Sequence, residues 1–266
     1  MKKSIKLCLL LILVLTMAVS LFGCGDSATH RSTTHKRTSD SDVEKNFKMK
    51  RIEGGYSIEK YIGGSENVHI PSEYKGYKIK KIEEHSFQHN KFVEKITVPS
   101  SIETIGDYAF ACKNLKSVEL NEGLKKIGDY AFSDAKINSI TIPRSTEQIG
   151  AYAFSGCERL YTVALNEGLK SIGEMAFNQT DIRGITIPKS VEKMGYNVFL
   201  SSGLEEADCR VGDKPDGWHE DWDVVNIKKI GLAFGGYKLE KSRCRVNWGV
   251  IIFNRKNKQQ VWNLAI

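Results

Sequence analysis

A chain of 266 residues with 41% hydrophobic and 27% charged residues can hold one or two domains, and this soluble, globular balance excludes a fibrous or wholly disordered protein. The formal charge is +7, but three of the 39 basic residues (Lys2, Lys3 and Lys6) lie in a segment that we expect to be removed, which leaves 36 against 32 acidic residues, or +4. This mild excess forms no basic stripe, so the sequence does not indicate nucleic-acid binding.

The first 23 residues predict an export signal. A short basic leader precedes an almost wholly apolar run over residues 7–22, which is too short for a comfortable membrane span. The run ends in Leu21-Phe22-Gly23-Cys24 and resembles a bacterial lipoprotein signal, whose cysteine becomes the lipidated first residue. The resemblance implies a lipid anchor on Cys24 that holds the protein on the outer side of the cell membrane. The alternative is an ordinary secretory signal with a coincidental cysteine.

Residues 24–46 are expected to form a disordered tether. Their sequence is rich in serine, threonine and charged residues, and Val43 is their only large apolar residue. Such a segment buries too little surface to offset the entropy lost on ordering.

A repeat dominates the next part of the chain. Six phenylalanines follow one another at spacings of 23, 22, 22, 23 and 22 residues, namely Phe87, Phe110, Phe132, Phe154, Phe177 and Phe199. Most of them close the phrase I-G-x-x-A-F, which is degraded in residues 194–199. Self-similarity at this period predicts a solenoid, in which each unit must stack on its neighbours to bury its apolar face.

Each unit predicts one short strand followed by a turn. An apolar triplet such as Leu115, Val118 and Leu120 ends in the alternation of a strand with one buried face. Stacked in register, one strand per coil makes a parallel sheet. The turns after the strands alternate between Pro-x-Ser, beginning at Pro99, Pro143 and Pro188, and Asn-Glu-Gly, beginning at Asn121 and Asn166.

The second half of each unit carries a glycine and the core plug. A further apolar pair precedes a glycine that recurs in every coil, at Gly106, Gly128, Gly150, Gly173 and Gly195. This recurrence implies either a special backbone angle or a close approach that a side chain would forbid. The Ala-Phe pair that follows is expected to fill the coil, on a turn or a short helical segment.

The repeat phrase, seen in full over residues 140–160, resembles the BspA-like class of leucine-rich repeat over residues 56–208. The resemblance implies a leucine-rich-repeat solenoid: a short parallel β-sheet with one strand per coil, turns and short helical segments on the other face, and a C-terminal cap. It also implies a bacterial cell-surface or secreted protein that adheres to host or matrix proteins. We assign residues 47–209 to the solenoid. Pro71 lies 16 residues before Phe87, against 11 in the next coil, so an extra loop is expected there.

Residues 210–266 are expected to cap the solenoid, because its last coil would otherwise expose an apolar cross-section. Family members often carry a K-P-x-G-W-x-x-x-W segment near this end, and the matching residues are Lys214, Pro215, Gly217, Trp218 and Trp222. The apolar stretch at 246–253 predicts one or two strands. The carboxylates here have no known calcium-loop spacing, so a solvated cap face is preferred over a calcium site: Asp213, Asp216, Glu220, Asp221 and Asp223.

Histidine and cysteine positions predict no metal site. His85 and His89 are four residues apart without a third ligand nearby, so we interpret both as surface histidines. Cys112 and Cys157 occupy corresponding slots two coils apart, which is too far for a disulfide, and are expected to be buried thiols. A bond between Cys209, which should point inward, and Cys244 remains open.

Two surfaces are candidates for binding. Tyr108, Tyr130 and Tyr152 precede Ala-Phe in three adjacent coils and form either an aromatic strip for a sugar or peptide or, as we prefer, a stacked ladder that supports the solenoid. The strand alternation leaves a flat row of mostly short side chains on the open face of the sheet. The candidate binding residues on this face are Thr97, Ser117, Glu119, Ser139, Thr141, Thr162 and Thr186.

The sequence favours a non-catalytic, lipid-anchored cell-surface protein that binds an extracellular or host protein or a matrix macromolecule. It has no Ser/His/Asp set, zinc signature or phosphate loop, so neither an enzyme nor a cofactor is expected. The first alternative is an accessory carbohydrate-binding component or a hydrolase with its site in the C-terminal cap. The second is a purely structural spacer.

Overall fold

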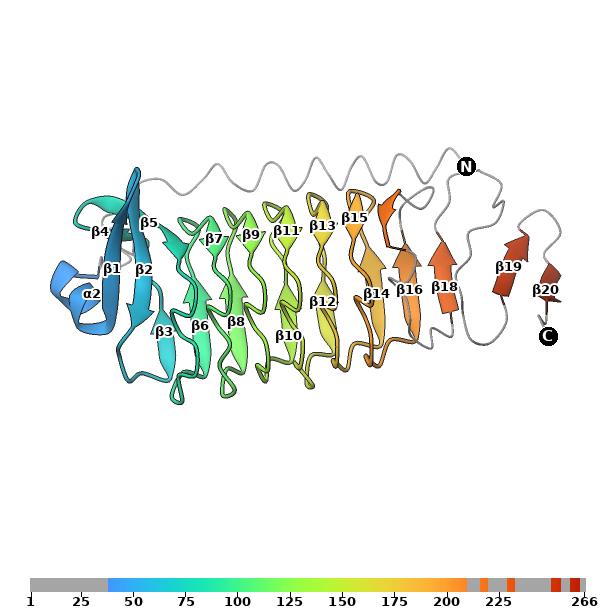
Figure 1. Cartoon of the computed structure of the whole chain (residues 1–266), viewed down its shortest axis with the longest axis horizontal. Coiled ribbons are helices and arrows are strands. Elements are labelled where there is room, and N and C mark those ends of the chain that lie inside the picture. Colours follow the sequence, from blue (N-terminus) through green and yellow to red (C-terminus); the bar gives the residue numbers. More distant parts are fainter. Residues whose placement is uncertain (1–37, 210–215, 220–228, 233–249, 255–258, 264–266) are drawn as a thin grey trace, which may run out of the picture. The chain divides into compact units, whose positions relative to one another are not determined.

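The chain forms a row of stacked coils (Figure 1). The structure, a computed structural model, describes residues 38–209, 216–219, 229–232, 250–254 and 259–263, and for Glu206 and the last three segments it describes only the backbone. Each regular coil contains a strand of a first ladder, a turn, a two-residue strand of a second ladder, and a longer turn that leads to the next coil.

The first ladder is parallel with one strand per coil, as predicted. It runs through β3(Asn67–His69), β6(Lys95–Val98), β8(Ser117–Leu120), β10(Ser139–Thr141), β12(Thr162–Ala164), β14(Gly184–Ile187) and β16(Glu206–Cys209). Parallel pairing joins β3 to β6, β6 to β8, β10 to β12, and β14 to β16. The apolar member of each strand, such as Ile96 or Val163, points into the core.

A second ladder lies on the other side of the coils, where the sequence predicts turns and short helical segments. It consists of the short strands β7(Thr104–Ile105), β9(Lys126–Ile127), β11(Gln148–Ile149), β13(Ser171–Ile172), β15(Lys193–Met194) and β17(Gly217–Trp218). The second member of the apolar pair after each turn, such as Ile105, is therefore the buried residue of a two-residue strand. Among the described residues the only helix lies in the N-terminal segment, and the Ala-Phe pairs lie on turns.

The six phenylalanines form a continuous column through the core, which confirms the prediction that they plug the coils. Their side chains are buried, and neighbouring ring centroids lie 5.1–5.6 Å apart. From Phe132 to Phe199 the rings are stacked and nearly parallel, with interplanar angles of 2°, 2° and 7°. This column gives every coil the same apolar contact above and below.

Close approach between coils explains the recurrent glycine. A Cβ atom on Gly128 would lie 2.4 Å from Asp107 Oδ1 and 2.8 Å from the Asp107 nitrogen of the preceding coil. Gly150, Gly173 and Gly195 would meet the preceding backbone equally closely. Their φ angles are not in the left-handed region, so distance and not backbone angle requires the glycine.

A special backbone angle occurs instead two residues later. Tyr108, Tyr130, Tyr152 and Met175 have φ between 48° and 55° although they carry side chains. This left-handed turn directs the amide groups along the row of coils. The Tyr130 nitrogen donates to the Ala151 oxygen at 2.9 Å, and the Phe132 nitrogen to the Ala153 oxygen at 2.8 Å. Turn-to-turn hydrogen bonds thus offset the cost of the strained angle.

An N-terminal unit covers the first coil, and it begins earlier than predicted. Helix α2(Asp40–Asn46) falls within the segment expected to be a disordered tether. The Ser39 side chain caps it by accepting from the Asp42 nitrogen, and Val43 is fully buried. One apolar residue suffices here because the rest of the protein provides the surface that buries it.

An antiparallel hairpin of β1(Phe47–Ile52) and β2(Gly55–Tyr61) completes the N-terminal unit. The Tyr61 ring stacks on Phe87 at 4.9 Å and continues the phenylalanine column into the hairpin. The expected extra loop is a second, small hairpin of β4(Glu73–Tyr74) and β5(Tyr77–Ile82), and β5 joins the hairpin to the second ladder.

Coil geometry continues past Cys209, where the sequence period is lost and the solenoid was predicted to end. Strand β17 pairs with β15 and puts Trp218 opposite Met194, and β18(Lys229–Leu232) pairs with β16. The Trp218 side chain is buried and its Nε1 donates to the Val191 oxygen at 3.0 Å. Further on, β19(Val250–Asn254) and β20(Gln259–Asn263) form an antiparallel hairpin, in agreement with the predicted strands of the tail.

The two turn sequences alternate because they interlock. Ser145 Oγ of a Pro-x-Ser turn accepts from the Gly123 nitrogen of the preceding Asn-Glu-Gly turn at 2.8 Å and donates to the Leu124 oxygen at 2.9 Å. Ser190 repeats this arrangement with Gly168 and Leu169. Ser101 also belongs to a Pro-x-Ser turn, but the preceding coil has the β4–β5 hairpin at this place and no Asn-Glu-Gly turn. Its buried Oγ has no hydrogen-bond partner among the described residues.

This difference predicts unequal effects of the same substitution. Ser145→Ala leaves the Gly123 amide unpaired and should lower the free energy of unfolding by about 1–3 kcal/mol. Ser101→Ala removes an unsatisfied hydroxyl and should change it by less than about 0.5 kcal/mol, or raise it. Urea unfolding followed by circular dichroism measures both, and equal losses would contradict the interlocking of the turns.

Candidate functional site

The open face of the first ladder carries all seven residues predicted for binding. Their side chains point away from the core because they alternate with its buried residues. Ser117, Glu119, Ser139, Thr141 and Thr162 are exposed, whereas Thr97 and Thr186 are half-buried.

The pairing register arranges these side chains in two columns. In the first, Asn67 lies beside Lys95 and Lys95 beside Ser117, and further along Ser139 lies beside Thr162. In the second, His69 lies beside Thr97 and Thr97 beside Glu119, and Thr141 lies beside Ala164. Neighbours within a column are about 4.8 Å apart, so the open face presents regularly spaced hydroxyl, amide and charged groups.

Three exposed residues extend this face beyond the prediction, namely Asn67, His69 and Lys95. Asn67 and His69 belong to β3 of the first coil, which Val68-His69-Ile70-Pro71 already indicates because this motif matches the later strand phrase. The alternation of that motif is the signal that places the two residues on the open face. Ser65 Oγ occupies the outer edge of β3 by accepting from the Asn67 nitrogen and donating to the Asn67 oxygen.

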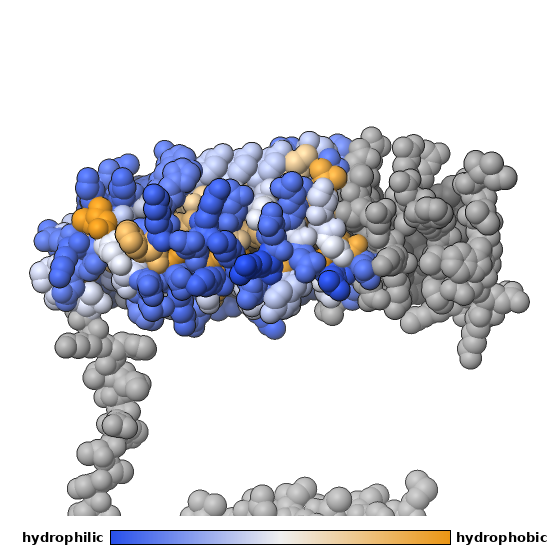
Figure 2. All heavy atoms as spheres, turned by 90° about the horizontal axis from the view of Figure 1, so that it is seen from below, coloured by the Kyte–Doolittle hydropathy of each residue, from blue (hydrophilic) through white to orange (hydrophobic). Residues whose placement is uncertain are grey.

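A neighbouring side of the coils is mainly hydrophilic. Figure 2 views the coils from below Figure 1 and shows hydrophobic atoms only in small, separate patches. A partner that touches this side must therefore be recognised through polar contacts rather than by an extended apolar surface.

The second ladder has an alternating column of charges. Lys80, Glu103, Lys125, Glu147, Lys170 and Glu192 follow one another in successive coils. Lys125 Nζ lies 2.8 Å from Glu103 Oε2, and Lys170 Nζ lies 3.2 Å from Glu147 Oε2. The hydrogen bond from Lys125 lowers the pKa of the Glu103 carboxyl. Because these side chains neutralise one another, the column is better suited to aligning the coils than to binding a charged ligand.

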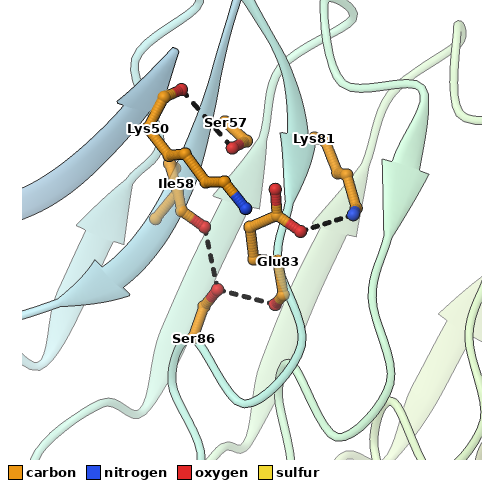
Figure 3. Close-up of polar contacts among 6 residues, drawn as sticks. All are labelled: Lys50, Ser57, Ile58, Lys81, Glu83 and Ser86. Atoms are coloured by element: carbon orange, nitrogen blue, oxygen red, sulfur yellow. Dashed lines mark hydrogen bonds and ion pairs between the residues drawn. The ribbon is translucent and has the colours of Figure 1, made fainter. Parts of the chain in front are cut away.

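A polar hollow of about 380 Å³ lies at the start of the second ladder and is lined by Lys81, Glu83, Glu84, Thr104, Ile105, Gly106, Asp107 and Lys126. Figure 3 shows Lys81 paired with Glu83 and the Lys50 side chain extending toward the same carboxylate. Burial opposes ionisation of Glu83, but hydrogen bonds from Lys81 and Ser57 outweigh it and lower the pKa. Glu83 occupies the position where later coils have glycine. Its neighbour is β2 of the N-terminal hairpin and not the turn of another coil, so a side chain fits here.

The Glu83 region also joins the first coil to the N-terminal hairpin. Ser86 Oγ contacts the Ile58 oxygen at 2.9 Å and the Glu83 oxygen at 2.6 Å, and Ser57 Oγ donates to the Lys50 oxygen at 3.5 Å (Figure 3). These contacts assign the polar residues around Glu83 a structural role, so the hollow is a weaker candidate site than the open face.

The tyrosines form the predicted stacked ladder. Ring centroids of Tyr108, Tyr130 and Tyr152 lie 4.6 and 4.7 Å apart with interplanar angles of 3°, and His85 stacks on Tyr108 at 5.2 Å. His85 Nδ1 lies 2.8 Å from Gln88 Oε1. No group of three or more metal-ligating side chains occurs within the described part of the chain.

Cys112 and Cys157 are buried thiols, as predicted. Cys112 Sγ donates to the Phe87 oxygen at 2.8 Å, and Cys157 Sγ to the Phe132 oxygen at 3.1 Å. Burial raises the pKa of each thiol to about 12. Cys209 is buried as well, but Cys244 lies outside the described residues, so a bond between them stays untested.

Several predictions fall outside the described residues. They are the export signal at 1–23, lipidation of Cys24, residues 24–37 of the tether and most of the cap at 210–266, including Trp222 and four of the five carboxylates suggested for calcium. Within the described residues, no helix combines the length and the apolar character needed to span a membrane.

Comparison with known proteins identifies the repeat. Residues 80–205 match the BspA type leucine-rich repeat region in six copies. The repeat region belongs to this family. The assignment agrees with the observed coils, since the strand and the phenylalanine of successive coils occupy equivalent positions, and the glycine does so from Gly106 onward. No match is found among curated protein sequences.

Several solved bacterial proteins are similar to this chain, and the first of them shares the fold. The pneumococcal vaccine antigen PcpA is 24% identical with a TM-score of 0.54, over 62% of this chain and 48% of that one. A leucine-rich cell surface protein of Faecalibacterium prausnitzii is 23% identical with a TM-score of 0.48, over 64% and 54%. A leucine-rich repeat protein of Bacteroides capillosus is 30% identical with a TM-score of 0.40, over 45% and 93%. The chain thus spans about half the length of the first two.

The buried thiols should resist modification in this leucine-rich repeat protein. At pH 8 a thiol whose pKa is about 12 is almost wholly protonated, so Cys112 and Cys157 should stay unlabelled by iodoacetamide in the folded protein and react fully in urea. Peptide mass spectrometry reads each site separately. Labelling of either site in the folded state, at a rate close to that in urea, would contradict the burial.

The same pKa shift predicts a loss of stability at alkaline pH. Because the folded state keeps the protons that the unfolded state releases, the free energy of unfolding should fall as the pH rises above the ordinary thiol pKa of about 8.5.

Proposed function

We propose that this leucine-rich repeat protein is a non-catalytic, lipid-anchored cell-surface protein whose open face binds a protein outside the cell. The partner is an extracellular or host protein, or a matrix macromolecule, and no nucleic acid or cofactor takes part. The observation that carries the proposal is the open face itself, on which mostly polar side chains, exposed or half-buried, follow one another from β3 to β14.

The chemistry of this face suits a broad, folded partner. Its hydrogen-bonding groups are spread evenly along the ladder and do not converge on one pocket, as the groups of a catalytic site do. The side chains beside one another on β10 and β12 are short, so another protein surface can approach the sheet closely. Charged residues near the N-terminal half, such as Lys95 and Glu119, add specificity to this contact.

Export and anchoring are supported by the first 24 residues. The basic leader, the apolar run and Cys24 together fit a lipoprotein signal, and one or more acyl chains at Cys24 would hold the soluble coils at the membrane surface. Most large apolar side chains of the described coils are buried in the core, so the proposed anchor is the lipid on Cys24.

A single substitution on the open face should test the binding role. Thr141→Arg places a long charged side chain in the middle of the face and should weaken saturable binding by about tenfold or more through steric and desolvation costs. Binding of the full chain is measured against immobilised matrix proteins, mucins and glycans.

The matched control is Gln148→Arg, an exposed residue of the same coil on the second ladder. It adds the same charge and should leave binding unchanged. Equal weakening by both variants would remove the open face from the proposal. Absence of saturable binding to any protein would contradict the proposed function, and turnover of a glycan would favour the hydrolase alternative.

The anchor has its own test. Radiolabelled palmitate should be incorporated into the wild-type protein in bacterial cells, and the Cys24→Ala variant should lose the label completely because it lacks the only thiol in the predicted lipidation motif. The control is Cys8→Ala, which should keep the label. Unchanged labelling of Cys24→Ala would overturn lipidation at this site.

A further inference from the structure

The long turns of the six coils form a straight edge of the protein, separate from the open face. We call it the turn edge and define it as residues 84–90, 107–112, 129–135, 151–157, 174–180 and 196–202. Backbone hydrogen bonds join successive turns, for example from the Tyr108 nitrogen to the Asp129 oxygen at 2.9 Å. These bonds hold the side chains of equivalent residues in line.

Charge is segregated on the turn edge. It contains no lysine or arginine, although the whole chain has 39 of them, and it has five carboxylates: Glu84, Asp107, Asp129, Asp134 and Glu174. Four of the five are exposed, and Asp107 is half-buried. The surrounding lysines lie on the ladders or begin the runs that follow the turns. The turn edge is therefore a strip that is negative along its own residues, and Lys81 and Lys126 border it beside Glu84 and Asp107.

Phenol groups add to this strip. Because Tyr108, Tyr130 and Tyr152 stack face to face, their ring faces are covered and only the ring edges with the hydroxyl groups are presented outward. These three hydroxyls make no hydrogen bond to any other described residue. A sugar that needs an open aromatic face finds none on the middle ring, whereas a hydrogen-bond donor finds a row of oxygens.

Carboxylates lie within electrostatic reach of these hydroxyls. Burial raises the pKa of Tyr130, and the neighbouring phenols and then Glu174 and Asp129 raise it further. Glu174 acts in the same direction on Tyr152. Phenol and carboxylate oxygens therefore lie near one another on the turn edge.

We propose that the turn edge binds an extended, arginine- or lysine-rich segment of a partner polypeptide. Guanidinium and ammonium groups donate several hydrogen bonds and carry the charge that this strip lacks. Anionic partners such as phosphorylated or sulfated chains are repelled by the same carboxylates. The stacked row from His85 to Tyr152 spans roughly 15 Å, which corresponds to about four or five residues of extended chain.

Backbone contacts preserve the strip when its charges are removed. Asp129 Oδ1 accepts from the Ala151 nitrogen at 2.8 Å, and an asparagine at this position keeps that oxygen. The double variant Asp129→Asn with Glu174→Gln therefore removes two charges while the turns stay folded.

The test uses the full chain in a non-ionic detergent and a fluorescent octapeptide of alternating arginine and serine, with anisotropy as the readout. Saturable binding is expected at low ionic strength and should weaken at physiological ionic strength. The Asp129→Asn/Glu174→Gln variant should weaken binding about fivefold, as expected for the loss of two exposed charge contacts. Tyr130→Phe, which keeps the ring stack and removes one hydroxyl, should weaken it about twofold.

The matched control is Glu103→Gln with Glu147→Gln, which removes two charges from the second ladder and should leave peptide binding within about twofold of wild type. Thr141→Arg on the open face should also leave it unchanged, which separates this surface from the one in the proposed function. Equal losses in the control and the turn-edge variant, or no saturable binding at low ionic strength, would overturn the proposal.

Discussion

Backbone hydrogen bonds hold successive coils about 4.8 Å apart, and this spacing decides which side chains each position can carry. At that distance equivalent residues touch along the whole row, so a position must stack well on a copy of itself. Phenylalanine does so in the core and tyrosine at the turns, with ring centroids 4.6–5.6 Å apart. Where backbones approach most closely, as at Gly128, only glycine fits.

The spacing also explains why two turn types alternate. A hydroxyl and a backbone amide are complementary groups, and they meet when a Pro-x-Ser turn follows an Asn-Glu-Gly turn, as at Ser145 and Gly123. The column of alternating lysine and glutamate beside the second ladder is likewise complementary, because opposite charges of neighbouring coils meet there. Alternation thus gives each coil a neighbour of the other kind and disfavours a shift by one coil.

The ends of the row depart from the repeat because an end coil lacks one neighbour. On the N-terminal side an antiparallel hairpin and α2 supply the missing contacts, and Glu83 stands where later coils need glycine. Ser101 keeps the serine of the repeat, but its Oγ lacks the backbone amide that pairs with the equivalent Ser145. On the C-terminal side Trp218 takes the place of an aliphatic residue of the second ladder and carries the coil geometry one step beyond the sequence period.

The sequence was sufficient to predict the repeat period, the phenylalanine column and the parallel ladder, because each of them recurs at one spacing. The strand alternation also predicted which side chains point outward: Thr97, Ser117, Glu119, Ser139, Thr141, Thr162 and Thr186. What the sequence left undecided are contacts between unlike segments. The sequence does not show whether the recurrent glycine is required by its backbone angle or by lack of space, because that depends on the atoms of the neighbouring coil. The second ladder could not be predicted because its strands have only two residues, too few for a recognisable alternation. Likewise α2 was hidden in a polar segment, since its single apolar residue is buried by a surface formed elsewhere in the chain. A periodic sequence determines which residues stack on their equivalents in neighbouring coils. Contacts between unlike segments depend on the tertiary structure, because only there do those segments meet.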